Sequence, residues 1–267
     1  MSRLSPNISL LFTEHQFSDR FKAAQDHGFE AIEFWPWEDQ SVIRKQVAVT
    51  GLSVSVLNVN PGPPGSHGEL ANPDATQWWQ DELVMATKFA LDIGCTTINA
   101  LTGNRLQKYS LDDQLSTAAA NLAEGLARMD GSGIDLVLEP LGPDRPGYLT
   151  RTVADAAKLR KAAGDPPTLM LLFDFYHLYQ TESQDVAELF VETVDFIKHV
   201  QIADVPGRHQ PGSGCIDWAA CRRAVDIAGY PGWIGLEYAP TENTADSLAQ
   251  ALTQWTPGRG TSDEHGR

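Results

Sequence analysis

The chain contains few cysteines and no long hydrophobic run. Its three cysteines, Cys95, Cys215 and Cys221, form no CxxC pair and are odd in number, which fits a reducing compartment better than a disulfide framework. No apolar run approaches the roughly 20 residues that a membrane-spanning helix needs. Segment 1–12 is too polar at its start for a secretion signal. We therefore expect a cytoplasmic protein without a membrane partner, in which Cys95 packs in the core.

Basic residues are also scarce. The chain has 20 lysines and arginines against 35 acidic residues, a net charge of −15. This charge repels phosphate backbones and anionic lipids, so we expect no nucleic-acid partner, and a metal-dependent endonuclease is disfavoured. No GxGxxG follows the first predicted strand, which removes the main reason to expect a dinucleotide-binding fold.

Apolar runs alternate with amphipathic segments along the whole chain. With 267 residues, of which 42% are hydrophobic, one large core is possible. Eight such units predict a parallel sheet that closes into a single (β/α)8 TIM barrel, with an open doubly wound sheet as the weaker alternative. The barrel is predicted over residues 1–255 and a flexible C-terminal tail over 256–267. The predicted strands are 7–12, 31–36, 53–60, 96–103, 135–140, 169–175, 197–203 and 233–238.

One connection differs in composition from the others. Loop 60–72 is rich in proline and glycine, which excludes a helix or an interior strand and predicts a lid or rim. Trp35 and Trp37 follow a predicted strand directly, so they are expected to form pocket walls. Trp78 and Trp79 lie in a predicted helix, where core packing or a subunit contact is expected. The second of these alternatives would make the protein a homo-oligomer.

Four predicted strands end on a group that can bind a metal: Glu139, Asp174, Gln201 and Glu237. Because the carboxyl ends of barrel strands open on one face, these side chains are expected to converge. Three carboxylates and an amide oxygen are hard donors that favour Mg²⁺ or Mn²⁺ over zinc. Taken singly, each is more often a helix cap or an ion-pair partner. Buried together, the carboxylates must hold either a cation or protons.

The segment 197–218 joins one of these strands to a glycine-rich loop. Strand alternation places His199 and Gln201 on the same face, and His199 is expected to have a structural role there. Arg208 lies in the loop, where most arginines face solvent. Asp204 is expected to orient Arg208 or a bound water.

Several motifs together resemble the hydroxypyruvate isomerase family, within the xylose-isomerase-like TIM barrels. They are NISLLF, AIEF, LEP, FDFYH, HVQIADVPGRHQPGSG and GLEY, and the resemblance runs from Asn7 to about Trp255. It implies that Glu139 and Glu237 are paired catalytic carboxylates, and that the same two residues bind the metal with Asp174 and Gln201. It also implies that His177 and Arg208 hold the substrate. Gln201 stands where related epimerases have histidine.

The implied reaction interconverts hydroxypyruvate and 2-hydroxy-3-oxopropanoate (tartronate semialdehyde) through an enediol, with metal-assisted proton transfer between adjacent carbons. The alternatives are an isomerase of a related 2-oxo sugar acid and a 3-epimerase of free ketoses. The epimerase should lack the arginine that grips a carboxylate. A sugar-acid binding module, which would bind ligand without turnover, is a further alternative.

Overall fold

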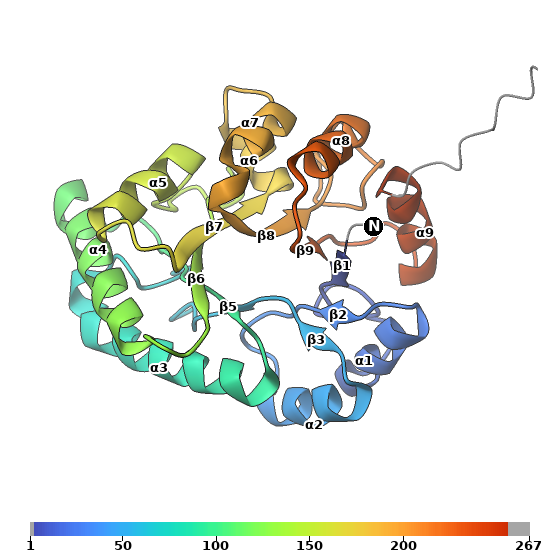
Figure 1. Ribbon diagram of the computed structural model, residues 1–267, viewed down its shortest axis with the longest axis horizontal. Helices are drawn as coiled ribbons and strands as arrows, with labels where there is room; N and C mark the ends of the chain where they lie inside the picture. Colours follow the sequence, from blue (N-terminus) through green and yellow to red (C-terminus); the bar gives the residue numbers. More distant parts are fainter. Residues whose placement is uncertain (1–2, 256–267) are drawn as a thin grey trace, which may run out of the picture.

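The computed structural model describes residues 3–255, and the predicted tail 256–267 lies outside them. Short parallel strands form a ring, and the helices surround it on the outside (Figure 1). The strands are β1 (Arg3–Pro6), β2 (Ala31–Ile32), β3 (Ser53–Val54), β4 (Leu57–Asn58), β5 (Thr97–Asn99), β6 (Asp135–Leu138), β7 (Leu169–Asp174), β8 (Ile197–Ile202) and β9 (Trp233–Leu236).

Two sets of parallel strands close the ring. One sheet has the order β1-β9-β8-β7-β6-β5-β4, and β2 pairs with β3. Asn7 forms an isolated parallel bridge with Glu33, and the Ile8 N–H donates to the Glu33 carbonyl at 2.9 Å, which joins β1 to β2. β3 and β4 together occupy one strand position. The predicted (β/α)8 barrel is confirmed, and the open doubly wound sheet was the wrong alternative.

Helices lie between most successive strands, and side-chain caps fix where several of them begin. Ser110 caps α4 by accepting a hydrogen bond from the Asp113 N–H, and Thr152 forms a capping box with Asp155 at the start of α5. The helices are α1 (Phe17–Asp26), α2 (Gln40–Thr50), α3 (Thr76–Ile93), α4 (Leu111–Arg128), α5 (Val153–Ala162), α6 (Phe175–Thr181), α7 (Val186–Thr193), α8 (Trp218–Ala228) and α9 (Thr244–Trp255). Two short 3₁₀ helices are η1 (Pro73–Ala75) and η2 (Val194–Phe196).

Two strand predictions were wrong. The first strand is Arg3–Pro6 rather than 7–12, because the chain turns at Asn7, whose carbonyl accepts from the Leu10 and Leu11 N–H groups. The run 53–60 is not one strand but two, β3 and β4. They pair with different neighbours, β2 and β5.

Apolar side chains fill the space between the strand ring and the helices. Cys95 and Trp79 are both buried there, as predicted, so Trp79 is a core residue rather than a subunit contact. Among residues 3–255, no helix is both long and apolar enough to cross a membrane.

Candidate active site

The barrel brings the four predicted strand-end residues to one end of the ring. Glu139 follows β6, Asp174 ends β7, Gln201 lies in β8 and Glu237 follows β9. Glu139, Gln201 and Glu237 line a common cavity of about 140 Å³. Asp174 reaches the same site through Arg208, which lines the cavity and contacts its carboxylate. The predicted convergence is therefore observed.

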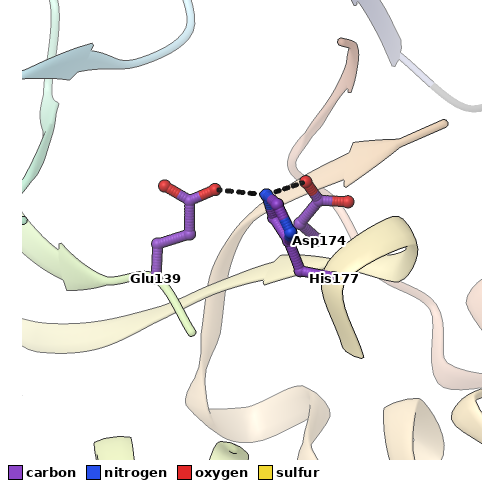
Figure 2. Close-up of side chains that lie close together, drawn as sticks. All are labelled: Glu139, Asp174 and His177. Atoms are coloured by element: carbon purple, nitrogen blue, oxygen red, sulfur yellow. Dashed lines mark ion pairs between the residues drawn. The ribbon is translucent and has the colours of Figure 1, made fainter. Parts of the chain in front are cut away.

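His177 stands between two of the carboxylates (Figure 2). Its Nε2 lies 3.5 Å from Asp174 Oδ2 and 4.0 Å from Glu139 Oε1. Asp174 caps α6 by accepting from the Tyr176 N–H at 2.8 Å, and this cap holds the helix that carries His177. The Gly142 N–H donates to His177 Nδ1 at 3.0 Å, closer than the Asp144 carboxylate at 3.5 Å. In the neutral ring, Nε2 then carries the proton and faces the carboxylates.

Arg208 does not face solvent. Its Nη2 donates to Glu237 Oε2 at 2.7 Å and lies 3.5 Å from Asp174 Oδ2. Burial would lower the pKa of Arg208, but the surrounding carboxylates, Glu237 first and then Asp174, raise it. The Arg208 Nε is buried and has no hydrogen-bond partner in the described part of the chain, so one N–H is available to a ligand.

Glu139 and Glu237 both have pKa values above that of an ordinary glutamate. Burial raises the pKa of Glu139 well above its usual value, and the charges of Glu237 and Asp174 add to the effect. Burial also raises the pKa of Glu237, although Arg208 opposes the shift. Both groups can therefore hold a proton at a higher pH than an exposed glutamate.

A buried hub at Glu33 sets the orientation of Gln201. Glu33 Oε1 accepts from Gln201 Nε2 at 2.9 Å, and Glu33 Oε2 lies 2.9 Å from His199 Nε2. Asn7 Nδ2 donates to both Glu33 and Glu237, at 3.3 Å each. His199 thus has the predicted structural role. Since the Gln201 nitrogen is held by Glu33, its buried Oε1 has no hydrogen-bond partner among residues 3–255.

The residues present fit a divalent cation. Carboxylate oxygens of Glu139 and Asp174 lie within 4.8 Å of each other, close enough to share one cation, and the His177 ring lies beside them as a hydrogen-bond donor. The unpartnered Gln201 Oε1 adds a hard oxygen donor at the same end of the barrel. Without a cation, buried carboxylates so close together are expected to remain partly protonated, in agreement with the raised pKa of Glu139.

Aromatic and proline residues surround the entrance. Trp35 and Trp37 line the cavity as predicted, and Trp35 Nε1 donates to Glu237 Oε1 at 2.9 Å. The inner cavity shares these walls with a larger chamber of about 550 Å³, which is lined in part by 60–65. Loop 60–72 therefore forms part of the rim, as predicted.

Asp204 organises the loop that carries Arg208. Its carboxylate is fully buried and accepts five hydrogen bonds. The donors are the N–H groups of Val205, Gly212, Gly214 and Ile216 and the indole of Trp218. No contact with Arg208 is needed for this role, because the carboxylate fixes the loop itself.

Three neighbours of the predicted residues were not among the predicted site residues. Glu33 and Asn7 lie at early strands, where a polar side chain indicates either a pocket wall or an internal hydrogen bond. Asn99 ends β5, and its Nδ2 donates to Glu139 Oε2 at 2.6 Å. The signal that could have identified Asn99 is a polar side chain inside the otherwise largely apolar predicted strand 96–103, since the observed strand β5 ends at this residue.

The sequence profile of the xylose isomerase-like TIM barrel family matches residues 21–255. The chain belongs to this family. The 2-oxo-tetronate isomerase of Cupriavidus necator is 32% identical over 253 residues, covering 93% of this chain and 96% of the relative. The hydroxypyruvate isomerase of Escherichia coli is 30% identical, covering 93% and 97%. Both relatives are named isomerases, and this member of the xylose isomerase-like family is an isomerase.

Solved structures agree with the family assignment. A protein described as an AP endonuclease, family 2, from Brucella melitensis has a TM-score of 0.88 and 29% identity, covering 95% of this chain and 99% of that one. An L-ribulose 3-epimerase has a TM-score of 0.72 and 23% identity, covering 96% and 88%. This second likeness shows the shared xylose isomerase-like fold alone.

Proposed function

We propose that the protein is an isomerase of small hydroxy-oxo acids, which interconverts hydroxypyruvate and 2-hydroxy-3-oxopropanoate. The observation that carries this proposal is the pair Glu139 and Glu237, which line one cavity and whose pKa values are raised by burial. A carboxyl group with a raised pKa exchanges protons closer to neutral pH. One such group can remove a proton from a carbon, while the other delivers a proton to the neighbouring carbon.

The two acids differ only in the positions of hydrogen atoms. One glutamate accepts a proton from C3 of hydroxypyruvate and the other donates a proton to C2, while the C3 hydroxyl loses its proton and the C2 oxygen gains one. His177 Nε2–H and the unpartnered Arg208 Nε–H are donors beside the cavity, suited to holding the two substrate oxygens. Trp35 and Trp37 form aromatic walls beside these groups.

Glu139, Asp174, Gln201 and Glu237 are the residues proposed to hold a divalent cation. Their oxygen donors suit Mg²⁺ or Mn²⁺, and the buried, unpartnered Gln201 Oε1 supports this assignment. When bound, such a cation would draw electron density from the substrate oxygens and so lower the cost of the negative charge that develops on them.

A related 2-oxo sugar acid is the second candidate substrate. The 32% identical relative from Cupriavidus necator is named a 2-oxo-tetronate isomerase. Moreover, the chamber of about 550 Å³ beside the inner cavity offers room for a longer carbon chain. The same proton transfer between C3 and C2 would serve both acids. A 3-epimerase of free ketoses, whose neutral substrate needs no cationic partner, is less well supported by a cavity that two arginines, Arg145 and Arg208, line.

Turnover with and without a chelator tests the proposal. We expect the purified protein to isomerise hydroxypyruvate, 2-oxo-tetronate or both, as followed by NMR of the products. EDTA should abolish the reaction, and added Mg²⁺ or Mn²⁺ should restore it. The proposal fails if neither acid is consumed under any of these conditions. A protein that instead cleaves a duplex containing an abasic site would support the endonuclease alternative, which the net charge of −15 disfavours.

A further inference from the structure

Acidic side chains outnumber cationic ones around the inner cavity. Within residues 3–255, its lining includes Glu33, Glu139 and Glu237, and its only lysine or arginine residues are Arg145 and Arg208. The guanidinium of Arg208 is already shared by Glu237 and Asp174. A substrate carboxylate that approached Arg208 alone would therefore lie close to the acids that share this cation, and their charges would repel it.

Arg145 is placed differently. It lies in the connection after β6 and lines both the inner cavity and the larger chamber, so it stands where the two meet. Its Nη1 donates to the Asp144 carbonyl at 3.0 Å and lies 3.4 Å from the Asp144 carboxylate. These are its guanidinium's hydrogen bonds within the described chain. Since a guanidinium has five N–H donors, the rest of this group is available to a bound anion.

The backbone around Arg145 is well fixed. The Gly142 N–H donates to His177, the Arg145 N–H donates to the Gly142 carbonyl at 3.0 Å, and the Tyr148 N–H donates to the Arg145 carbonyl at 3.1 Å. The neighbouring His67 adds no second cation, because burial lowers its pKa and the charge of Arg145 lowers it further. Arg145 is therefore the positive group at this junction.

We propose that Arg145 determines specificity by binding the substrate carboxylate at the mouth of the inner cavity, while Arg208 stays paired with Glu237 and Asp174. This inference rests on the proposed function. It places C1 of the acid toward the outer chamber, with C2 and C3 between Glu139 and Glu237. It also explains how a site rich in acids can select an anionic substrate over a neutral ketose.

Calorimetric binding of D-glycerate tests the role of Arg145 independently of turnover. D-Glycerate has the carboxylate of hydroxypyruvate but lacks its oxo group, so it cannot isomerise. We expect Arg145→Gln to raise its Kd about 10-fold to 100-fold, and Arg145→Lys to recover part of the loss. Arg128→Gln is the matched control, because Arg128 pairs with an acid on α4 at a similar side-chain exposure, 41% against 36%. This control should bind like the wild type.

In turnover, Arg145→Gln should raise KM for hydroxypyruvate by a similar factor and change kcat little. The inference is overturned if the wild type does not bind D-glycerate, if Arg145→Gln binds it like the wild type, or if both glutamine variants weaken binding equally. Failure of the wild type to isomerise either acid would instead refute the proposed function. The binding result would still show whether Arg145 holds a carboxylate.

Discussion

At the scale of single residues, Glu139 has a carboxyl group whose ionisation opposes folding. Burial raises its pKa, and the charges of Glu237 and Asp174 raise it further. The folded state therefore binds this proton more tightly than the unfolded chain, so the stabilisation is complete below the unfolded pKa. It is lost as the pH rises through the folded pKa. A variant that cannot ionise at this position should not show this loss.

Glu139→Gln should therefore be more stable than the wild type at pH 8 when divalent cations are removed. We expect its Tm to be higher by about 3 °C, measured by thermal melting in EDTA, with the difference vanishing near pH 4. The same variant should lose activity by a factor of about 100 or more, because it cannot transfer a proton. If the Tm of Glu139→Gln at pH 8 equals that of the wild type or is lower, neighbouring groups offset the cost of burying the ionised Glu139 carboxylate.

Gln201 allows a metal-specific test with a matched control. Within the described residues, both Gln201 and Gln80 have a buried Oε1 without a hydrogen-bond partner. Gln80, however, lies in α3, donates to the Asn121 carbonyl and does not line the cavity. We expect Gln201→Leu to weaken Mn²⁺ binding at least about tenfold by paramagnetic resonance, as expected when a ligand or its support is lost. Gln80→Leu should leave Mn²⁺ affinity unchanged. Equal affinities in both variants would remove Gln201 from the metal site.

At the scale of elements, the loop between β8 and α8 depends on one buried carboxylate. Asp204 accepts four backbone N–H groups and the Trp218 indole, and an asparagine would set an NH₂ group against these donors. We expect Asp204→Asn to cost about 2–4 kcal/mol in urea denaturation. It should also raise KM, since Arg208 is carried by this loop. Unchanged stability would mean that the loop is held by its other contacts.

The rim of the chamber depends on a close backbone approach. Gly68 lies in loop 60–72 with φ +124°, and a Cβ there would lie 2.3 Å from the Leu101 carbonyl oxygen. Gly65, in the same loop, also has a positive φ, but a Cβ there would meet nothing within 4 Å. Gly68→Ala should therefore destabilise the protein by about 2 kcal/mol more than Gly65→Ala, measured by denaturation. Equal effects would indicate that loop 60–72 and the segment around Leu101 can move apart to make room for the added Cβ.

At the scale of the whole molecule, the barrel follows from patterns that are local in sequence. Each apolar run and amphipathic helix can be recognised by itself, and eight such units in succession favour closure. Strand limits are set instead by neighbours in space. The first strand ends where the chain turns at Asn7, which still bridges to Glu33, and 53–60 divides because its two halves pair with different strands. These pairings cannot be read from one segment alone.

In the candidate site, too, some features could be predicted from local sequence patterns and others depend on the folded chain. Glu139, Asp174, Gln201 and Glu237 were predictable because each ends an apolar run at the same edge of the sheet. The pairing of Arg208 with Glu237 was not predictable, since the loop that carries Arg208 is folded by Asp204 and has no regular periodicity. Arg145 was missed for a related reason. Its importance comes from lying where two cavities meet, which only the folded chain shows.

Isomerisation of hydroxypyruvate in D₂O tests the central claim, that Glu139 and Glu237 move a proton between adjacent carbons. With Mg²⁺ present, NMR should show 2-hydroxy-3-oxopropanoate carrying deuterium at C2, because the carboxyl groups exchange with solvent. Glu139→Gln and Glu237→Gln should each abolish this product. Product that forms without any deuterium, or that forms at the wild-type rate in either variant, would contradict the account.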